Sequence, residues 1–151
     1  MDRDPILVRA LKSDWIKPNA VEDEARVKPE GFQVREFQGD GLSCFDNECL
    51  KTNSLETAVI RRCFSQPDTY QYFCWFRVSE LEKIRIELAD VDIQVVNSPT
   101  NIKCKASPCH NIVKFSSTLK EKEIRRIRNY LLALLTNDRL VEFTDTSRIQ
   151  T

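Results

Sequence analysis

One histidine and one serine are the best candidates for acid–base chemistry in this chain. His110 is the only histidine among 151 residues, and it stands where a loop enters an apolar stretch, a common place for pocket residues. Histidine titrates near neutral pH, so it is the natural residue to transfer a proton. Ser43 follows a cluster of glycines and is a candidate to orient a substrate. A lone histidine is also commonly a structural donor or a surface residue, and that alternative stays open.

Two arginines are candidates to bind a phosphate or a carboxylate. Arg9 interrupts the first apolar run of the chain, and a guanidinium at the end of a buried strand can bind such groups with two parallel hydrogen bonds. It can equally extend from an edge strand into water. Arg35 is the second candidate, and Trp15 is a candidate for the pocket wall or for the core. An arginine on the first strand and Ser43 on the second loosely match an ADP-ribosyltransferase site, a fold-level analogy without an assignable glutamate.

Two pairs of cysteines have a spacing that a metal ion could use. Cys44 and Cys49 are separated by four residues, as are Cys104 and Cys109, with His110 next to the last. Such thiolates could close a tetrahedral zinc site of four cysteines, or of three cysteines and a histidine. Zinc ribbons favour a gap of two residues, and cysteine is also a common small buried hydrophobe. We therefore expect no cofactor, with zinc as the alternative.

The oxidation state of the six cysteines follows from the expected compartment. Three disulfides would require an oxidising compartment. The N-terminal residues are charged, and nothing in them has the apolar core of a signal peptide. We therefore expect a cytoplasmic protein with reduced thiols, in which Cys63 and Cys74 act as small hydrophobes.

The last helix expected in the chain is rich in basic residues, and such a cluster could contact nucleic-acid phosphates. The same pattern is typical of the solvated face of an amphipathic helix, so both interpretations stay open. The basic residues are Lys120, Lys122, Arg125, Arg126 and Arg128.

Composition and missing motifs exclude several classes of function. The chain has 23 basic and 23 acidic residues, so the molecule as a whole has no net attraction to nucleic acid or to an anionic membrane. It has neither a glycine-rich phosphate loop nor a serine nucleophile elbow. No segment approaches the roughly 18 apolar residues of a membrane span. We expect a single domain over residues 1–151 and no membrane partner.

Apolar periodicity and turn residues predict an α+β fold. The fold is expected to be a mostly antiparallel sheet of about five strands with two or three helices, the C-terminal amphipathic helix packed on the sheet. Capping boxes at Ser79–Glu82 and Thr118–Glu121 predict two helix starts, and Ser54 predicts a third. The expected strands span residues 6–10, 41–45, 70–78, 91–95 and 110–115, with a possible edge strand at 140–143.

The order of these features resembles a group of small uncharacterised bacterial proteins that share a Leu-Ser strand and a Pro-x-His strand. The group has no established activity, so the resemblance supports the choice of Ser43 and His110 without supplying a function. The matching segments are Leu7-Val8-Arg9-Ala10-Leu11, Trp15, Phe37, Gly41-Leu42-Ser43, Ser98-Pro99 and Pro108-Cys109-His110-Asn111-Ile112-Val113-Lys114-Phe115.

Two classes of function remain. We favour a protein-interaction component, such as a partner in a bacterial toxin, immunity or defence module. The alternative is a small enzyme on a nucleotide or nucleic-acid substrate, with Arg9 or Arg35 on phosphate, Ser43 orienting the substrate and His110 as acid or base. A single concave pocket that joins Arg9, Ser43 and His110 would favour the enzyme.

Overall fold

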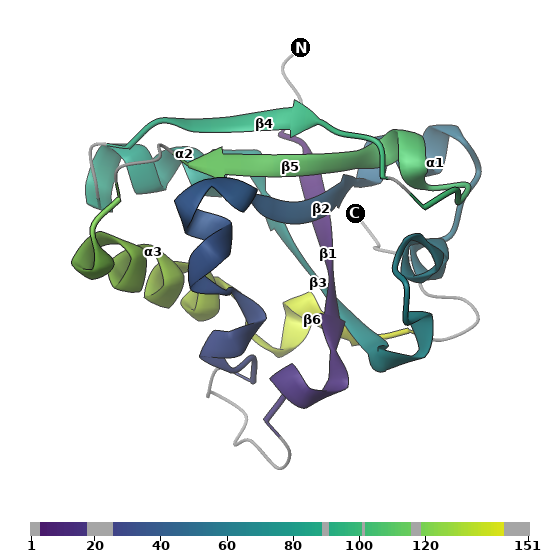
Figure 1. Cartoon of the computed structure of the whole chain (residues 1–151), viewed down its shortest axis with the longest axis horizontal. Coiled ribbons are helices and arrows are strands. Elements are labelled where there is room, and N and C mark those ends of the chain that lie inside the picture. Colours follow the sequence, from purple (N-terminus) through teal and green to yellow (C-terminus); the bar gives the residue numbers. More distant parts are fainter. Residues whose placement is uncertain (1–3, 18–25, 89–90, 101, 116–118, 144–151) are drawn as a thin grey trace.

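The chain is built around one antiparallel sheet of six strands (Figure 1). This computed structural model describes residues 4–17, 26–88, 91–100, 102–115 and 119–143. The order across the sheet is β4-β5-β2-β1-β3-β6. The α+β class and the antiparallel sheet are confirmed, with six strands where about five were expected. The strands are β1 (Ile6–Lys12), β2 (Leu42–Asp46), β3 (Tyr70–Arg77), β4 (Ile93–Asn97), β5 (His110–Phe115) and β6 (Leu140–Glu142).

Three α-helices, α1 (Asn47–Thr52), α2 (Val78–Lys83) and α3 (Glu121–Leu134), occur in the described residues. The expected amphipathic character of α3 is confirmed, since its apolar stripe is buried in the core. None of the described helices is long and apolar enough to cross a membrane. Short 3-10 and π segments are η1 (Ser13–Trp15), η2 (Pro29–Gly31), η3 (Glu36–Asp40), η4 (Thr57–Cys63), η5 (Pro67–Thr69), η6 (Ile84–Leu88), η7 (Ser107–Cys109) and η8 (Asn137–Arg139).

The start of α2 lies earlier than the sequence predicted. Its N-cap is Arg77, whose backbone N–H donates to Glu80 Oε1 at 2.8 Å. The predicted cap, Ser79, instead bonds through its backbone N–H and its hydroxyl to the Asp4 carboxylate. Ser79 therefore binds Asp4 of the N-terminal segment and does not cap α2.

Two other predicted helix starts also differ. The N-cap of α3 is Lys120, whose N–H donates to Glu123 Oε1 at 3.0 Å, whereas Thr118 lies outside the described residues. Ser54 has a φ of 56° and is not a cap. The helical segment η4 begins only at Thr57 and is a 3-10 helix. The preceding helix α1 was not expected from the sequence.

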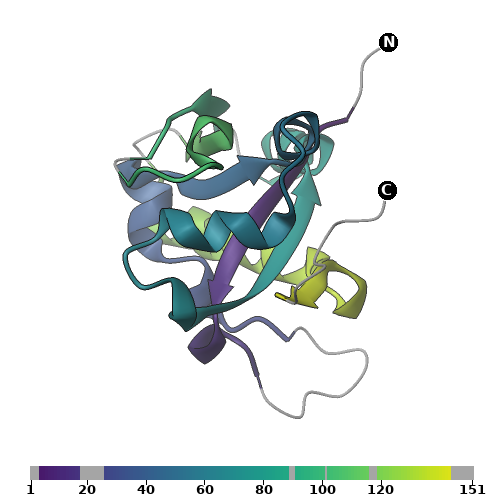
Figure 2. The same cartoon turned by 90° about the vertical axis from the view of Figure 1, so that its right-hand side faces the viewer.

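The sheet separates two apolar clusters. On the α3 face, Leu7 and Leu11 of β1 pack with α2, η6 and α3. On the opposite side, which we call the η4 face, Val8 and Ala10 pack with η4 and α1. Figure 2 shows η4 in front of β1 and α3 behind it. Both faces of β1 are therefore buried from Ile6 to Leu11, so a polar side chain on this part of the strand must find its partners inside the protein.

The prediction of six reduced thiols is wrong, because four cysteines form two disulfides. Cys49 of α1 is bonded to Cys109 of η7, with 5.5 Å between the Cα atoms. Cys63 of η4 is bonded to Cys104, with 5.4 Å between the Cα atoms. The fold brings η7, the end of the loop before β5, beside α1, so cysteines far apart in the chain pair with each other. Both bonds lie on the η4 face.

The remaining cysteines, Cys44 and Cys74, are buried free thiols on the α3 face. Burial raises the pKa of each thiol to about 12, because the interior disfavours the thiolate. The expected hydrophobic role of Cys74 agrees with this position. Among the described residues, no group of three or more His, Cys, Asp or Glu could hold a metal ion. The four cysteines of the zinc alternative are divided between the two disulfides and the opposite face.

Candidate functional site

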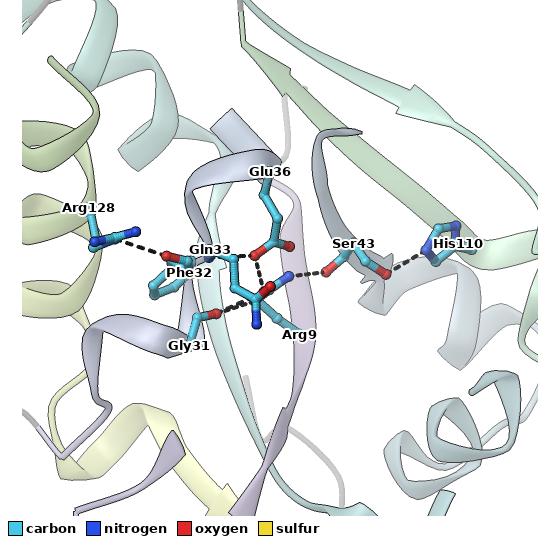
Figure 3. Close-up of polar contacts among 8 residues, drawn as sticks. All are labelled: Arg9, Gly31, Phe32, Gln33, Glu36, Ser43, His110 and Arg128. Carbon is cyan, nitrogen blue, oxygen red and sulfur yellow. Dashed lines mark hydrogen bonds and ion pairs between the residues drawn. The ribbon is translucent and has the colours of Figure 1, made fainter. Parts of the chain in front are cut away.

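Ser43 and His110 meet across the β2–β5 pair (Figure 3). The register places Ser43 opposite Ile112 and Phe45 opposite His110, so serine and histidine are diagonal neighbours on the η4 face of the sheet. Ser43 Oγ lies 2.7 Å from His110 Nε2. Two of the residues singled out in the sequence are therefore in direct contact.

The second ring nitrogen of His110 determines how the proton is held. His110 Nδ1 is hydrogen bonded to the carbonyl oxygen of Ser98, which directly follows β4. A carbonyl oxygen can only accept, so the proton of the neutral imidazole is on Nδ1. Nε2 is then an acceptor, and the hydroxyl of Ser43 donates to it. The three groups form a chain from Ser43 through the imidazole to the Ser98 carbonyl.

His110 is held in the neutral form by its surroundings. Burial lowers the pKa of His110 below its ordinary value of 6.5, and the hydrogen bond with Ser98 opposes this only in part. The Phe45 ring meets the imidazole edge to face, with 5.0 Å between centroids. His110 is 8% exposed, whereas Ser43 is partly exposed. The pair thus consists of a packed, neutral imidazole and a serine that is only partly buried.

Asn97 fixes the backbone around this pair. Its side-chain amide donates to the carbonyl oxygens of Pro108 and His110, at 3.0 and 3.3 Å. The Ser98 N–H also donates to the His110 carbonyl, at 2.9 Å. These bonds tie the end of β4 to the start of β5. The Ser98 carbonyl is therefore positioned by the same residues that position the imidazole.

Arg9 lies on the other side of the sheet, where all three nitrogens of its guanidinium donate to protein groups (Figure 3). Nε and Nη2 donate to the Gly31 carbonyl oxygen at 3.2 and 2.8 Å, and Nη2 also donates to Glu36 Oε1 at 2.8 Å. Nη1 donates to the backbone carbonyl oxygen of Ser43 at 3.0 Å. The Arg9 side chain is only 5% exposed. It holds the 31–36 segment against the sheet and shares no pocket with Ser43 Oγ.

The segment that receives Arg9 is anchored a second time by α3. Gln33 N–H donates to Glu36 Oε1 at 2.8 Å, the same oxygen that binds Arg9. Arg128 Nε donates to the Phe32 carbonyl oxygen at 2.9 Å. Gly31, Phe32 and Glu36 were not singled out in the sequence, because nothing in a loop of mixed composition indicates which carbonyl will meet a buried arginine.

Trp15 packs against the apolar cluster of the α3 face and lies at one end of a row of aromatic rings that leads to His110. Trp15 meets Tyr70 edge to face at 6.3 Å, and Tyr70 stacks on Phe64 at 4.2 Å. Phe64 meets Phe45, at 6.3 Å, and Phe45 meets His110. Trp15 is thus separated from the imidazole by three rings and does not contact it. Arg35 is exposed at the start of η3, and its substrate-binding role stays a prediction.

The basic residues of α3 do not form one uniform surface. Arg128 is committed to Phe32, and Arg125 pairs with Glu121 across one helical turn at 3.6 Å. Lys120, Lys122, Arg125 and Arg126 are exposed. Nucleic-acid binding by this helix remains a prediction.

The other notable surface is the edge strand beside the Ser43–His110 pair. Among the described strands, β4 pairs only with β5, and Figure 1 shows it at the rim of the sheet. Val95 and Val96 are 38% and 37% exposed and lie on opposite faces of the strand. On the α3 face, β4 and α2 form the walls of a groove of about 260 Å³. The groove is lined by Val78, Leu81, Glu82, Arg85, Ile93 and Val95.

Comparisons with known proteins add no assignment. No protein-family model, no curated protein and no solved structure matches the chain. Its function must therefore be argued from the geometry of its own residues.

Proposed function

We propose that this chain is a protein-interaction component that binds an extended segment of a partner protein along the free edge of β4. The observation that carries the proposal is the apolar outer side of this strand, which pairs with no strand other than β5 among the residues that the structure describes. Edge strands bind other chains in this way because their free N–H and C=O groups continue the ladder of the sheet. The proposal does not require Ser43, His110 or Arg9.

The hydrogen-bonding pattern identifies which backbone groups of β4 are free for a partner. Ser98 N–H donates to His110 O, so this is a hydrogen-bonded pair of the antiparallel ladder. Every second residue shares that orientation, which directs the N–H and C=O of Val96 toward β5. The residues between them direct their groups outward. These outward-facing residues are Ile93, Val95 and Asn97.

The side chains of β4 lack the features that usually protect an edge. Its sequence, Ile-Gln-Val-Val-Asn, has no lysine, no proline and no other charge, whereas protected edges commonly carry one of these. At the opposite edge, β6 is only three residues long and ends in Glu142. A short, charged strand is a poor template for strand addition. The two edges are thus unequal, and β4 is the one suited to a partner.

The groove beside β4 defines the chemistry of the partner. Ile93 and Val95 form one apolar wall and Leu81 of α2 lies opposite, with Glu82 and Arg85 also lining the groove. An extended segment bound to β4 would direct every second side chain into this groove. We therefore propose a partner segment with apolar residues at alternate positions and few charges between them. The same proposal takes this partner to be a protein of a bacterial toxin, immunity or defence module.

The cytoplasmic location expected from the sequence also remains a proposal, and the disulfides provide its test. Reducing systems of the cytoplasm keep thiols reduced. Cells are quenched in acid to fix the thiol state, and the protein is then alkylated in denaturant, which exposes the buried thiols. This treatment would modify all six cysteines of a cytoplasmic protein. Modification of Cys44 and Cys74 alone would contradict the cytoplasmic location.

The strand-addition proposal can be tested with peptides of defined sequence. Peptides of about ten residues are selected against the protein from a random display library, and their affinities are measured by fluorescence polarisation. Selected peptides should show apolar residues at alternate positions. They should bind Val95→Lys at least about tenfold more weakly, the loss expected for about 1.4 kcal/mol of apolar contact.

The matched control is Val34→Lys, which places the same charge at another exposed valine, 44% accessible and far from β4 in the chain. This variant should bind the peptides as the unmodified protein does. Equal affinity for Val95→Lys and the unmodified protein would contradict the proposal.

A further inference from the structure

The Ser43–His110 pair has the arrangement of an activated nucleophile. We propose that Ser43 is the nucleophile, and His110 the general base, of an acyl-transfer site that hydrolyses esters with a short apolar acyl group. Nucleophilic catalysis by serine needs a base within hydrogen-bond reach and a third group that orients the base. Here these are Nε2 at 2.7 Å and the Ser98 carbonyl on Nδ1. The inference is independent of strand addition at β4.

The proton arrangement is the one that the reaction needs at its start. The Ser98 carbonyl fixes the imidazole proton on Nδ1, which leaves the lone pair of Nε2 for the hydroxyl proton of Ser43. Burial keeps the ring neutral, and a protonated ring could not act as a base. A backbone carbonyl takes the place that a carboxylate holds in a Ser-His-Asp triad. It orients the ring and stabilises the cation that forms.

Two other serines in the described part of the chain have ordinary structural partners. Ser79 Oγ is bonded to the Asp4 carboxylate, and Ser107 Oγ is bonded to Thr100. Neither has a base that titrates near neutral pH. Ser43 differs from these two by its histidine partner, and as a residue it is partly exposed. The approach of an ester to Oγ is part of the proposal.

The surface next to Ser43 indicates the acyl group. Ile112 lies directly opposite Ser43, and Val96 lies directly opposite Ile112. These three side chains form one row on the η4 face, running from Ser43 to the free edge of the sheet. Gly41 contributes no side chain, and a Cβ there would lie 2.0 Å from Ile112 Cγ2. An acyl chain of a few carbons can lie along Ile112 and Val96 with its carbonyl carbon at Ser43.

The reaction proceeds in two balanced steps. Ser43 Oγ bonds to the ester carbonyl carbon while its proton moves to His110 Nε2. The bond from that carbon to the alcohol oxygen then breaks, and Nε2 returns the proton to the departing alcohol. In the second step, water gives a proton to Nε2 and its oxygen bonds to the acyl carbon. The Ser43 ester bond breaks, Oγ recovers the proton, and a carboxylic acid leaves.

Covalent labelling tests the nucleophile directly. A fluorophosphonate probe bonds its phosphorus to an activated serine oxygen and releases fluoride. Peptide mass spectrometry should place the label on Ser43, and Ser43→Ala should remove it. His110→Gln should slow labelling by about 100-fold or more, the contribution of a general base. Ser65→Ala, a change at an exposed serine, should label as the unmodified protein does.

Hydrolysis of p-nitrophenyl butyrate should be lost with the same two variants and kept in Ser65→Ala. Thermal unfolding and circular dichroism establish whether Ser43→Ala and His110→Gln are folded. No label on Ser43 of the unmodified protein, or equal ester hydrolysis by folded Ser43→Ala, would overturn the proposal.

The pH dependence of the labelling rate tests the role of His110 in the unmodified protein. This test does not depend on whether a variant folds. The labelling rate should rise with pH as His110 loses its proton. Because burial lowers the pKa of His110, the midpoint should lie below 6.5. A rate that is independent of pH between 4.5 and 7.5, roughly the range over which a perturbed histidine titrates, would exclude His110 as the base.

Discussion

Removal of the Arg9 guanidinium should destabilise the protein more than any surface substitution. In Arg9→Met the carboxylate of Glu36 keeps the hydrogen bond from the Gln33 N–H and loses the one from Arg9. The Glu36 side chain is only 12% exposed, so water replaces the lost partner poorly. The Gly31 carbonyl loses both of its bonds from Arg9, and the Ser43 carbonyl loses one. The substitution thus leaves a largely buried charge without its partner, together with two carbonyl groups that lose hydrogen bonds.

The magnitude follows from these losses. Breaking a buried ion pair by removing one partner costs about 3–5 kcal/mol. The double variant Arg9→Met with Glu36→Leu removes both charges, so it should cost clearly less than the sum of the two single changes. The exposed pair Arg125–Glu121, at 3.6 Å, supplies the control. Arg125→Met should cost about 0.5 kcal/mol or less.

Urea unfolding followed by circular dichroism measures these differences. With a slope of about 2 kcal/mol per molar urea, a loss of about 4 kcal/mol lowers the midpoint by about 2 M. The double variant should recover part of that shift. A loss below about 1 kcal/mol for Arg9→Met, or strict additivity of the two single changes, would refute the interpretation of Arg9 as a buried anchor.

Three further predictions follow from individual residues. Gly41→Ala should cost about 2 kcal/mol or more in urea unfolding, because Gly41 has a φ of 81° and its new Cβ would meet Ile112; an unchanged midpoint would contradict this. Alkylation of the denatured, unreduced protein should modify only Cys44 and Cys74, and mass spectrometry showing six modified cysteines would contradict the disulfides. The pKa of His110 is lowered on folding, so the unfolded state binds this proton more readily. His110 therefore makes the free energy of unfolding fall as pH drops from about 6.5 toward its folded pKa. Urea unfolding at several pH values across this range should show the loss, and folded His110→Gln should not show it.

Strand positions were predictable because a run of aromatic and β-branched residues bounded by turn residues is a local property of the chain. The expected strand at 110–115 matches β5, and the expected segment at 70–78 matches β3 to within one residue. Helix starts were less predictable, since tertiary contacts can bind the side chain that the local sequence marks as a cap. Ser79 matched the pattern of a capping box, yet Asp4 from a distant segment occupies it.

Residue types indicated part of the site, but only the register brings its members together. Ser43 and His110 were chosen for their chemistry, and the β2–β5 pairing places them in contact. The partners of Arg9 come from a loop without a recognisable pattern. Cysteine spacing suggested pairs within each short segment, whereas the disulfides join different segments. Cys49 pairs with Cys109 because α1 packs beside η7, a tertiary contact that spacing does not encode.

Amide hydrogen exchange, observed residue by residue by NMR, tests strand addition at β4 most directly. In the free protein, the outward-facing amides of Ile93, Val95 and Asn97 should exchange much faster than those of Gln94 and Val96. A bound peptide from the library should protect the three outward-facing amides by about tenfold or more, as a new ladder of hydrogen bonds requires. Peptide binding that leaves these three amides unprotected, with protection elsewhere in the chain, would contradict the proposed function.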